Sequence, residues 1–96
     1  MMYSLKATSA DCMWHKIDES LWNPYLTYQQ NRMNGCDLPL EDMPVLIYDT
    51  DKPKYLVGRI GIHYYKDQKR LVVYESVHGE IYGGVSYILW HEIDYI

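Results

Sequence analysis

The stretch PVLIYDTDKPKYLVGRIGIHYYKDQKRLVVYESV, residues 44–77, decides the fold of this chain. It is rich in Val, Ile, Leu and Tyr, which favour β-strands, and two short polar segments interrupt it at 51–54 and 66–69. Segments of this length are typical hairpin turns, and hairpins join antiparallel strands. The pattern therefore predicts three consecutive antiparallel strands, at Val45–Asp49, Tyr55–Tyr65 and Arg70–Val77.

One more strand is predicted on the C-terminal side of this stretch. Val85–Tyr95 has the same composition, and it follows a turn at His78-Gly79 and a glycine pair, Gly83-Gly84, that favours a bend or bulge. Composition does not change along the chain, so residues 1–96 are interpreted as one domain. We expect an α+β fold, mostly β: an antiparallel meander sheet of about four to five strands with one short helix.

The helix is predicted ahead of the strands, from Pro24 to Met33. Asn23 is a good N-cap, Pro24 suits the first helical position, and Gly35 is placed to end the helix. The apolar stripe of this segment is weak. A loop with a single helical turn is therefore the competing interpretation.

Alternation along the predicted strand Tyr55–Tyr65 separates its side chains into two faces. One face carries Leu56, Ile60, Ile62 and Tyr64. The other face carries Tyr55, Arg59, His63 and Tyr65. Because the second face is neither cleanly polar nor cleanly apolar, we expect the helix or a partner to cover part of it.

A near-repeat joins the two ends of the chain. Trp14-His15-Lys16-Ile17-Asp18 matches Trp90-His91-Glu92-Ile93-Asp94 except at one position. If both segments are strands, they present matching faces, and we predict that they lie close in space, with Lys16 opposite Glu92 as a cross-strand ion pair. The alternative is coincidence, since a single short match does not define a repeat architecture.

The aromatic composition is unusual, because the chain has 11 Tyr and 3 Trp but no Phe. A buried tyrosine hydroxyl needs a hydrogen-bond partner, so part of the tyrosines should lie at the surface, where aromatic residues form recognition patches. The alternative is that Tyr replaces Phe on half-buried strand faces. The net charge of −4, with acids and bases interspersed, argues against direct binding of nucleic acid.

Hydropathy predicts no membrane-spanning segment, because no apolar run approaches the ~20 residues that a membrane helix needs. The N-terminus lacks the features of a signal peptide, so we expect a cytoplasmic protein. Cys12 and Cys36 are too few for a disulfide scaffold and should be thiols there, although the two could also pair.

Metal and catalytic sites are not expected. Cys12 and His15 have a ligand-like spacing, with Cys36 and His91 as completing residues, but a structural zinc site usually has two closely spaced pairs. Nucleophilic catalysis would need a pair such as Ser76 and His78, which lies in no recognisable elbow. A general base such as His91 cannot share a site with its neighbour Glu92, because adjacent strand residues point to opposite faces. We predict no catalytic residue, no metal and no cofactor.

One longer motif resembles a known family. Leu38-Pro39-Leu40-Glu41-Asp42-Met43-Pro44-Val45-Leu46-Ile47-Tyr48, preceded by Trp14 and closed by Trp90, is similar to a family of small phage and prophage domains of unknown function. The chain departs from that pattern by an extra segment, Leu21–Cys36, and by the lack of a proline-rich tail. The resemblance implies a compact β-rich fold and a phage origin, and it implies no catalytic residues.

The leading functional hypothesis is a non-enzymatic protein-binding accessory protein, a phage-type inhibitor of a host antiviral-defence factor. An acidic, Tyr-rich chain suits a basic nucleic-acid-handling protein as its partner. The predicted partner-binding residues are Tyr55, Arg59, His63, Tyr65 and Tyr74, with Glu75 and Glu80 as charges at the rim. The alternative is a binder that sequesters a nucleotide, as a homodimer with the site at its interface, by stacking the base on Tyr or Trp and holding the phosphate with Arg59 or Lys54.

Overall fold

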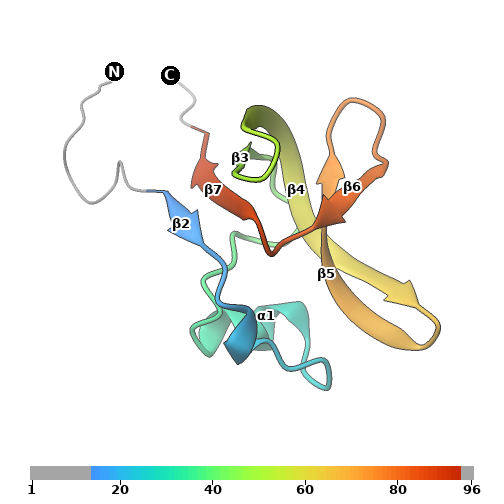
Figure 1. The fold of residues 1–96 in the computed structure, drawn as a ribbon. Helices are drawn as coiled ribbons and strands as arrows, with labels where there is room; N and C mark the ends of the chain where they lie inside the picture. The colour runs from blue at the N-terminus through green and yellow to red at the C-terminus, as the bar shows by residue number, and fades with distance from the viewer. Residues whose placement is uncertain (1–13, 94–96) are drawn as a thin grey trace.

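The structure, a computed structural model, describes residues 14–93. Its elements are β2 (His15–Lys16), the 3₁₀ helix η2 (Glu19–Leu21), α1 (Tyr28–Met33), β3 (Val45–Asp49), β4 (Lys54–Tyr65), β5 (Gln68–Glu75), β6 (Ile81–Gly84) and β7 (Ile88–Glu92). Within the described residues the strands form one antiparallel sheet of six, and α1 lies beside it (Figure 1). The predicted fold class, mostly β with one short helix, is confirmed.

The order of strands in the sheet is β2-β7-β3-β4-β5-β6. The predicted meander is therefore present from β3 to β6, and it ends there. β7 pairs with β3, with Ile47 opposite Trp90, and does not continue from β6. The single strand predicted at Val85–Tyr95 is wrong at its start, because Val85–Tyr87 connects two strands that lie in different parts of the sheet.

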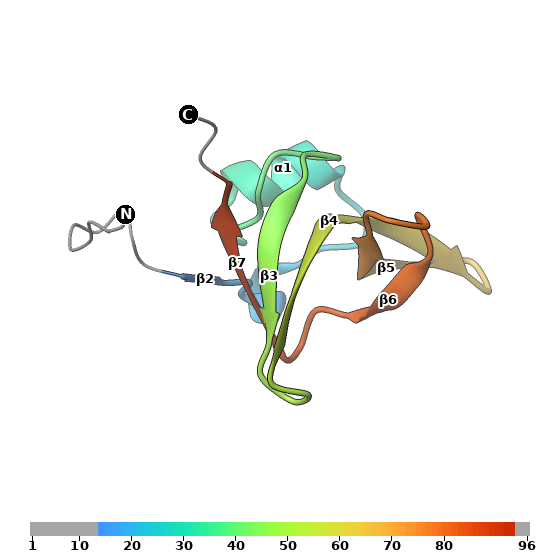
Figure 2. The ribbon, with the colours of Figure 1, turned by 90° about the horizontal axis from the view of Figure 1, so that it is seen from above.

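This order requires the sheet to curl. β6 and β7 are four strand spacings apart, which in a flat sheet is about 19 Å. The chain from Gly84 to Ile88 can span at most about 14 Å. The sheet therefore bends until β6 approaches β3 and β7, as Figure 2 shows. The hydroxyl of Tyr82 on β6 donates a hydrogen bond to the buried carboxylate of Asp49 on β3, and so links two strands that are not neighbours in the sheet.

Two local features allow β4 to follow this path. A Cβ at Gly58 would lie 2.6 Å from the backbone oxygen of Tyr74, so only glycine permits the strands to approach so closely. At the end of β4, Lys66 and Asp67 have φ values of 48° and 67°. Two consecutive residues with positive φ are typical of a type I′ turn, whose twist matches that of the β4–β5 hairpin.

The core lies on the inner face of the curled sheet, toward α1. Alternation in β4 is as predicted there, since Ile60 is fully buried and Leu56 and Ile62 pack against the core. The other members of the buried core cluster are Ile17, Tyr28, Cys36, Leu38, Val45, Ile47, Leu71, Val73, Val85, Ile88 and Trp90. Segment 17–44 thus packs on the inner face, and near its end Asp42 reaches the outer face, where it pairs with Arg59.

The helix begins later than predicted. Thr27, not Asn23, is the N-cap: its hydroxyl accepts a hydrogen bond from the backbone N–H of Gln30, and the Gln30 side chain accepts one from the backbone of Thr27. This capping box satisfies two N–H groups at once, and so it defines the helix start more strongly than a lone Asn. The helix therefore comprises only Tyr28–Met33.

Asn23 instead belongs to a turn that a buried side chain holds in place. Asn31 is fully buried, and its amide oxygen accepts from the backbone N–H of Asn23 at 2.6 Å. Its amide nitrogen donates to the carbonyl oxygens of Asn23 and Thr27. Asn31 thus ties segment 22–25 to α1.

The predicted proximity of the near-repeats is confirmed. β2 pairs with β7, with His15 opposite Trp90, and the two rings stack at 4.2 Å between centroids. The predicted ion pair between Lys16 and Glu92 is wrong. Antiparallel pairing places Lys16 opposite Leu89, and its ammonium donates to the carbonyl oxygen of Ser86.

Candidate functional site

The outer face of the sheet carries the side chains that the sequence analysis assigned to a partner. Tyr55, Arg59, His63 and Tyr65 alternate with the core residues of β4, so they share this face. Tyr74 lies opposite Arg59 in the β4–β5 register and joins them. The structure therefore brings five of the seven predicted residues to one surface.

At one end of this surface four rings form what we call the aromatic cluster: Trp14, Tyr48, Tyr55 and His91. Trp14 lies 6.0 Å from Tyr55 and 5.5 Å from His91, measured between ring centroids. Tyr48 and Tyr55 lie opposite each other in the β3–β4 register, with centroids 4.7 Å apart. Tyr55 remains 65% exposed, so the cluster presents a ring to solvent. Clustered, partly exposed aromatic rings are typical of binding hot spots.

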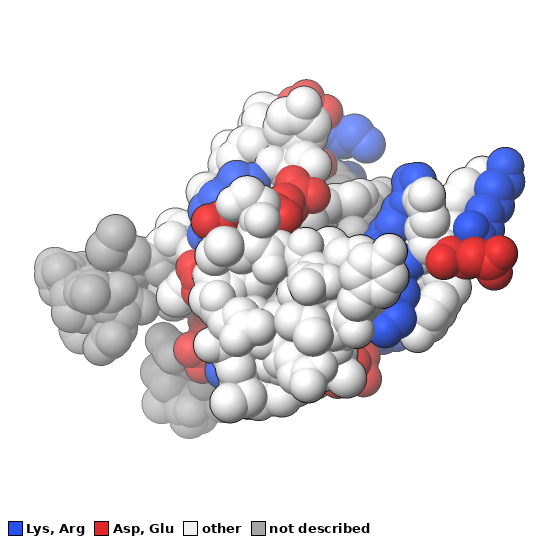
Figure 3. Space-filling model, turned by 90° about the horizontal axis from the view of Figure 1, so that it is seen from below, with Lys and Arg blue, Asp and Glu red and all other residues white. Residues whose placement is uncertain are grey.

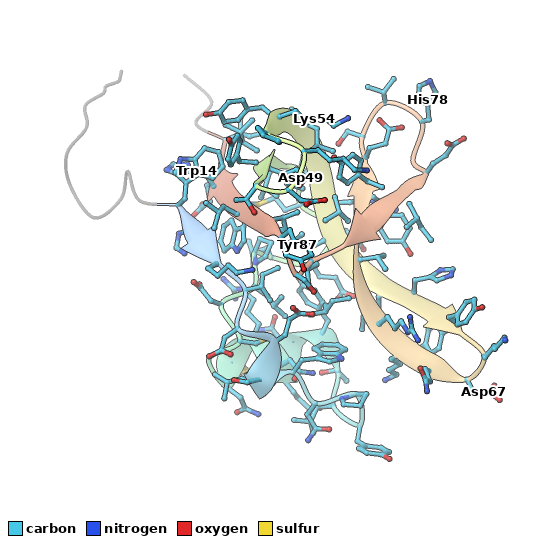
Figure 4. The ribbon with its side chains drawn as sticks, in the orientation of Figure 1. Trp14, Asp49, Lys54, Asp67, His78 and Tyr87 are labelled. Carbon is cyan, nitrogen blue, oxygen red and sulfur yellow. The ribbon has the colours of Figure 1, made fainter. Side chains whose placement is uncertain are left out.

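Farther along β4 the outer face carries what we call the arginine–tyrosine ladder: Arg59, Tyr74, Arg70 and Tyr65. The Arg59 guanidinium lies 4.2 Å from the centroid of the Tyr74 ring, and that of Arg70 lies 5.3 Å from the Tyr65 ring. Such contacts hold long side chains in extended positions across the strands. The ladder follows the β4–β5 hairpin toward its tip, where Figure 4 shows Asp67.

A glycine shapes the centre of the ladder. A Cβ at Gly61 would lie 3.1 Å from the Tyr74 ring, so this ring lies across the space that a side chain at 61 would need. The Tyr74 hydroxyl donates to the carbonyl oxygen of Ile62 at 3.2 Å. The Arg59 guanidinium also contacts this ring, so mutual contacts hold the Tyr74 side chain, which reduces the entropy that it would lose on binding.

The charge of this face differs from that of the whole chain. Arg59 and Arg70 lie on it, and His63 lies opposite Arg70 in the register. Arg59 makes a hydrogen-bonded ion pair with Asp42 at 2.9 Å, in which the carboxylate is mostly exposed. Arg70 donates to the neutral side chain of Gln68 and makes no ion pair with the described residues. The ladder is therefore locally basic on an acidic chain.

The two predicted rim charges lie elsewhere, at the turn between β5 and β6. The Glu75 carboxylate accepts hydrogen bonds from the backbone N–H groups of Val77 and His78 and pairs with the His78 ring at 2.9 Å. Partial burial acts to raise the pKa of Glu75, but these hydrogen bonds outweigh it and hold the pKa below its usual range. Glu80 precedes β6 in the same turn, and its carbonyl oxygen accepts from Glu75. Glu75 thus orders a turn whose tip, at His78, points away from the sheet (Figure 4).

The side chains considered for metal or phosphate binding do not converge in the described part of the chain. Cys12 lies outside the described residues, and the buried Cys36 thiol donates to the carbonyl oxygen of Asp18. Burial raises the pKa of the Cys36 thiol. Among residues 14–93 no group of three His, Cys, Asp or Glu could hold a metal ion. Lys54 and Arg59, considered for a phosphate, lie on opposite faces of β4 because their positions differ in parity.

Sequence reasoning missed four members of the outer face, namely Trp14, Tyr48, Arg70 and His91. The near-repeat contained the signal for two of them, because it pairs the strand of Trp14 with that of His91. Tyr48 could be placed only once β3 was known to lie between β7 and β4.

Comparison of the chain with protein-family models, with curated proteins and with solved structures found no match. None of the helices in residues 14–93 is long and apolar enough to cross a membrane. The functional argument therefore depends on the geometry of the outer face.

Proposed function

We propose that this chain is a non-enzymatic protein-binding module whose contact surface is the outer face of its sheet. The observation that carries the proposal is the continuity of the aromatic cluster and the arginine–tyrosine ladder along β4. Tyr, Trp and Arg are the residues in which hot spots of protein interfaces are enriched. Here they are held in place by mutual contacts, so little side-chain entropy is lost when a partner binds.

The partner is proposed to be a protein with an acidic contact surface. The acidic net charge of the chain favoured a basic partner. The groups on the outer face that would touch the partner are instead basic, namely Arg59, Arg70 and His63. Complementary potential across an interface depends on the facing groups more than on the total charge, and it mainly governs association rate and specificity. The narrower form of the proposal keeps the cytoplasmic location and the inhibition of a host antiviral-defence factor.

The test is affinity capture from a bacterial lysate with the tagged full chain, in parallel with Arg59→Ala and Tyr55→Ala variants. Quantitative mass spectrometry identifies a stoichiometric partner, and calorimetry then measures its affinity for each variant. Each substitution should weaken binding by ~30-fold or more if it removes a hot spot, since a loss of about 2 kcal/mol is a factor of roughly 30. Tyr25→Ala is the control, because Tyr25 is 93% exposed and lies outside the outer face.

Salt dependence separates this proposal from its rivals. The association rate with an acidic surface should fall as salt is raised, because salt screens the attraction between the two surfaces. A partner whose affinity is unchanged in both variants would refute the assignment of the outer face. Inhibition of a captured defence factor in vitro, lost in the Arg59→Ala variant, would support the narrower form.

A further inference from the structure

The edge of β5 is longer than the strand that covers it. β5 comprises eight residues, Gln68–Glu75, whereas β6 pairs with it only from Val72 to Tyr74. Residues 68–71 pair with β4 on one side, and among residues 14–93 no strand pairs with them on the other. The chain leaves this edge after Gly84 and turns toward β7. Half of β5 is therefore an open sheet edge.

The direction of the free backbone groups follows from the hydrogen bonds around β5. The N–H of Glu75 donates to the carbonyl oxygen of Glu80 on the β6 side, and the N–H of Ser76 donates to Val57 on the β4 side. In an antiparallel ladder these directions alternate along the strand. The N–H and C=O groups of Lys69 and Leu71 thus point to the open edge, while those of Arg70 point to β4.

A groove lies along this edge. Its inner part has a volume of about 280 Å³ and lies between Leu71 on β5, Ser86 after β6, and Trp22. It continues into a space of about 650 Å³ between the hairpin tip, with Tyr64 and Lys69, and the segment that carries Trp22 and Tyr25. Lys69 and Trp22 line both parts. Figure 3 shows that the α1 side is largely uncharged and that Lys and Arg side chains follow its border with the hairpin.

We propose that this groove binds an extended segment of another protein, which adds to β5 as a further strand. A row of alternating N–H and C=O groups at an open edge is matched along its length by another extended backbone. The groove provides room for such a segment beside Lys69 and Leu71, where a continuation of β6 would lie. This surface is distinct from the outer face and does not depend on the function proposed above.

The flanking side chains predict the sequence of the bound segment. Lys69 and Leu71 point to the inner face, so residues of the segment opposite them would lie against Trp22, which packs on the core. The residue opposite Arg70 would lie on the outer face, next to a guanidinium that makes no ion pair with the described residues. Cross-strand neighbours on one face are the pairs that interact. The preferred segment therefore alternates apolar residues with an acidic residue opposite Arg70.

The experiment selects binders from a displayed library of random octapeptides on the immobilised full chain. Enriched peptides are expected to carry an acidic residue flanked at alternate positions by apolar ones. A synthetic peptide of the enriched sequence should bind the Lys69→Ala variant within a few-fold of the wild-type affinity. It should lose at least ~10-fold with Lys69→Pro, because proline removes the edge N–H but leaves the bonds to β4. Met33→Ala, at an exposed position of α1 that lines neither part of the groove, should bind the peptide like the wild type.

Amide hydrogen exchange of the wild-type protein gives a second readout that needs no variant to fold. The Lys69 amide should exchange at least ~10-fold faster than the Arg70 amide in the free protein, and the peptide should slow it. Equal peptide affinity of the Lys69→Pro and wild-type proteins would overturn the proposal. A Lys69 amide that is already protected in the free protein would also overturn the proposal. Protection that does not depend on protein concentration would mean that another part of this chain covers the edge. Protection that appears only at high concentration would mean that a second copy covers it.

Discussion

Replacing Asn31 by Leu should be one of the most destabilising single changes in segment 17–44. The fully buried amide makes three hydrogen bonds to the backbone of Asn23 and Thr27. A net contribution of about 1 kcal/mol for each gives a loss of ~3 kcal/mol, before any penalty for leaving the Asn23 groups unpaired. Leu matches Asn in the number and branching of its side-chain heavy atoms and has a good helix propensity. The change therefore removes the hydrogen bonds without shortening the side chain, and the bulkier methyl groups add crowding to the loss. For a domain of this size the melting temperature should fall by roughly 12–24 °C.

Urea unfolding followed by tryptophan fluorescence measures this change, because three Trp report on the fold. Gln29→Leu is the control, because it also replaces an amide side chain by Leu, on the exposed side of the same helix. It should change the free energy of unfolding by less than about 0.5 kcal/mol. If the free energies of unfolding of the two variants lie within ~1 kcal/mol of each other, the Asn31 amide does not hold segment 22–25 and does not support this wall of the groove.

Three further predictions concern the sheet. The hydrogen bond from Tyr82 lowers the pKa of Asp49. Its contribution to the free energy of unfolding is therefore present above the unfolded-state pKa of about 4 and is lost as pH falls through the folded-state pKa. Tyr82→Phe should flatten this acid dependence in urea unfolding at pH 2–7. Replacing Lys66-Asp67 by Asn-Gly should stabilise the protein by about 1 kcal/mol in thermal unfolding, because both positions have positive φ. Gly58→Ala should destabilise it by more than about 2 kcal/mol, because its Cβ would overlap a backbone oxygen at 2.6 Å.

The Gly58 prediction has a control in the same chain. Gly84→Ala adds a Cβ with nothing within 4 Å, so a loss equal to that of Gly58→Ala would show that strand glycines matter for their flexibility and not for close approach. The hydrogen bond of Tyr82 also predicts a change in stability at alkaline pH. Its pKa is raised to about 12, chiefly by the hydrogen bond to Asp49. This part of the stability should decline between pH 10 and 12 in wild type, and Tyr82→Phe should lack that decline.

The strands that local signals specify were predicted well. Val45–Asp49 was predicted with the bounds that the structure has, and the β4–β5 hairpin was predicted because its turn separates two strongly patterned runs. β6 was missed, because Ile81–Gly84 is half glycine and gains its place from pairing with β5. The position of β7 was also missed, since no local feature tells a strand to pair with one that lies forty residues earlier. The helix start was readable from Thr27-x-x-Gln30, a capping-box pattern that the prominence of Asn23-Pro24 obscured.

In the candidate site too, local patterns placed some residues correctly, and others could be placed only from the fold. Alternation within β4 was sufficient to place Tyr55, Arg59, His63 and Tyr65 on one face. The placement of Glu75 depended on the hydrogen bonds of a turn, where alternation no longer applies. The open edge of β5 could not be predicted, because it follows from the mismatch in length between β5 and β6, and only the fold reveals that mismatch.

The pairing of β7 between β2 and β3 has a consequence for how the protein folds. The β3–β4 and β4–β5 hairpins can close early, because their contacts are local in sequence. β3 then has a free edge until residues near 90 are available, and only their arrival lets β2 dock, with His15 beside Trp90. The aromatic cluster, whose rings come from β3, β4, β7 and the segment before β2, should therefore assemble last. Environment changes at Trp14 would mark the final step of folding, after the hairpins have formed.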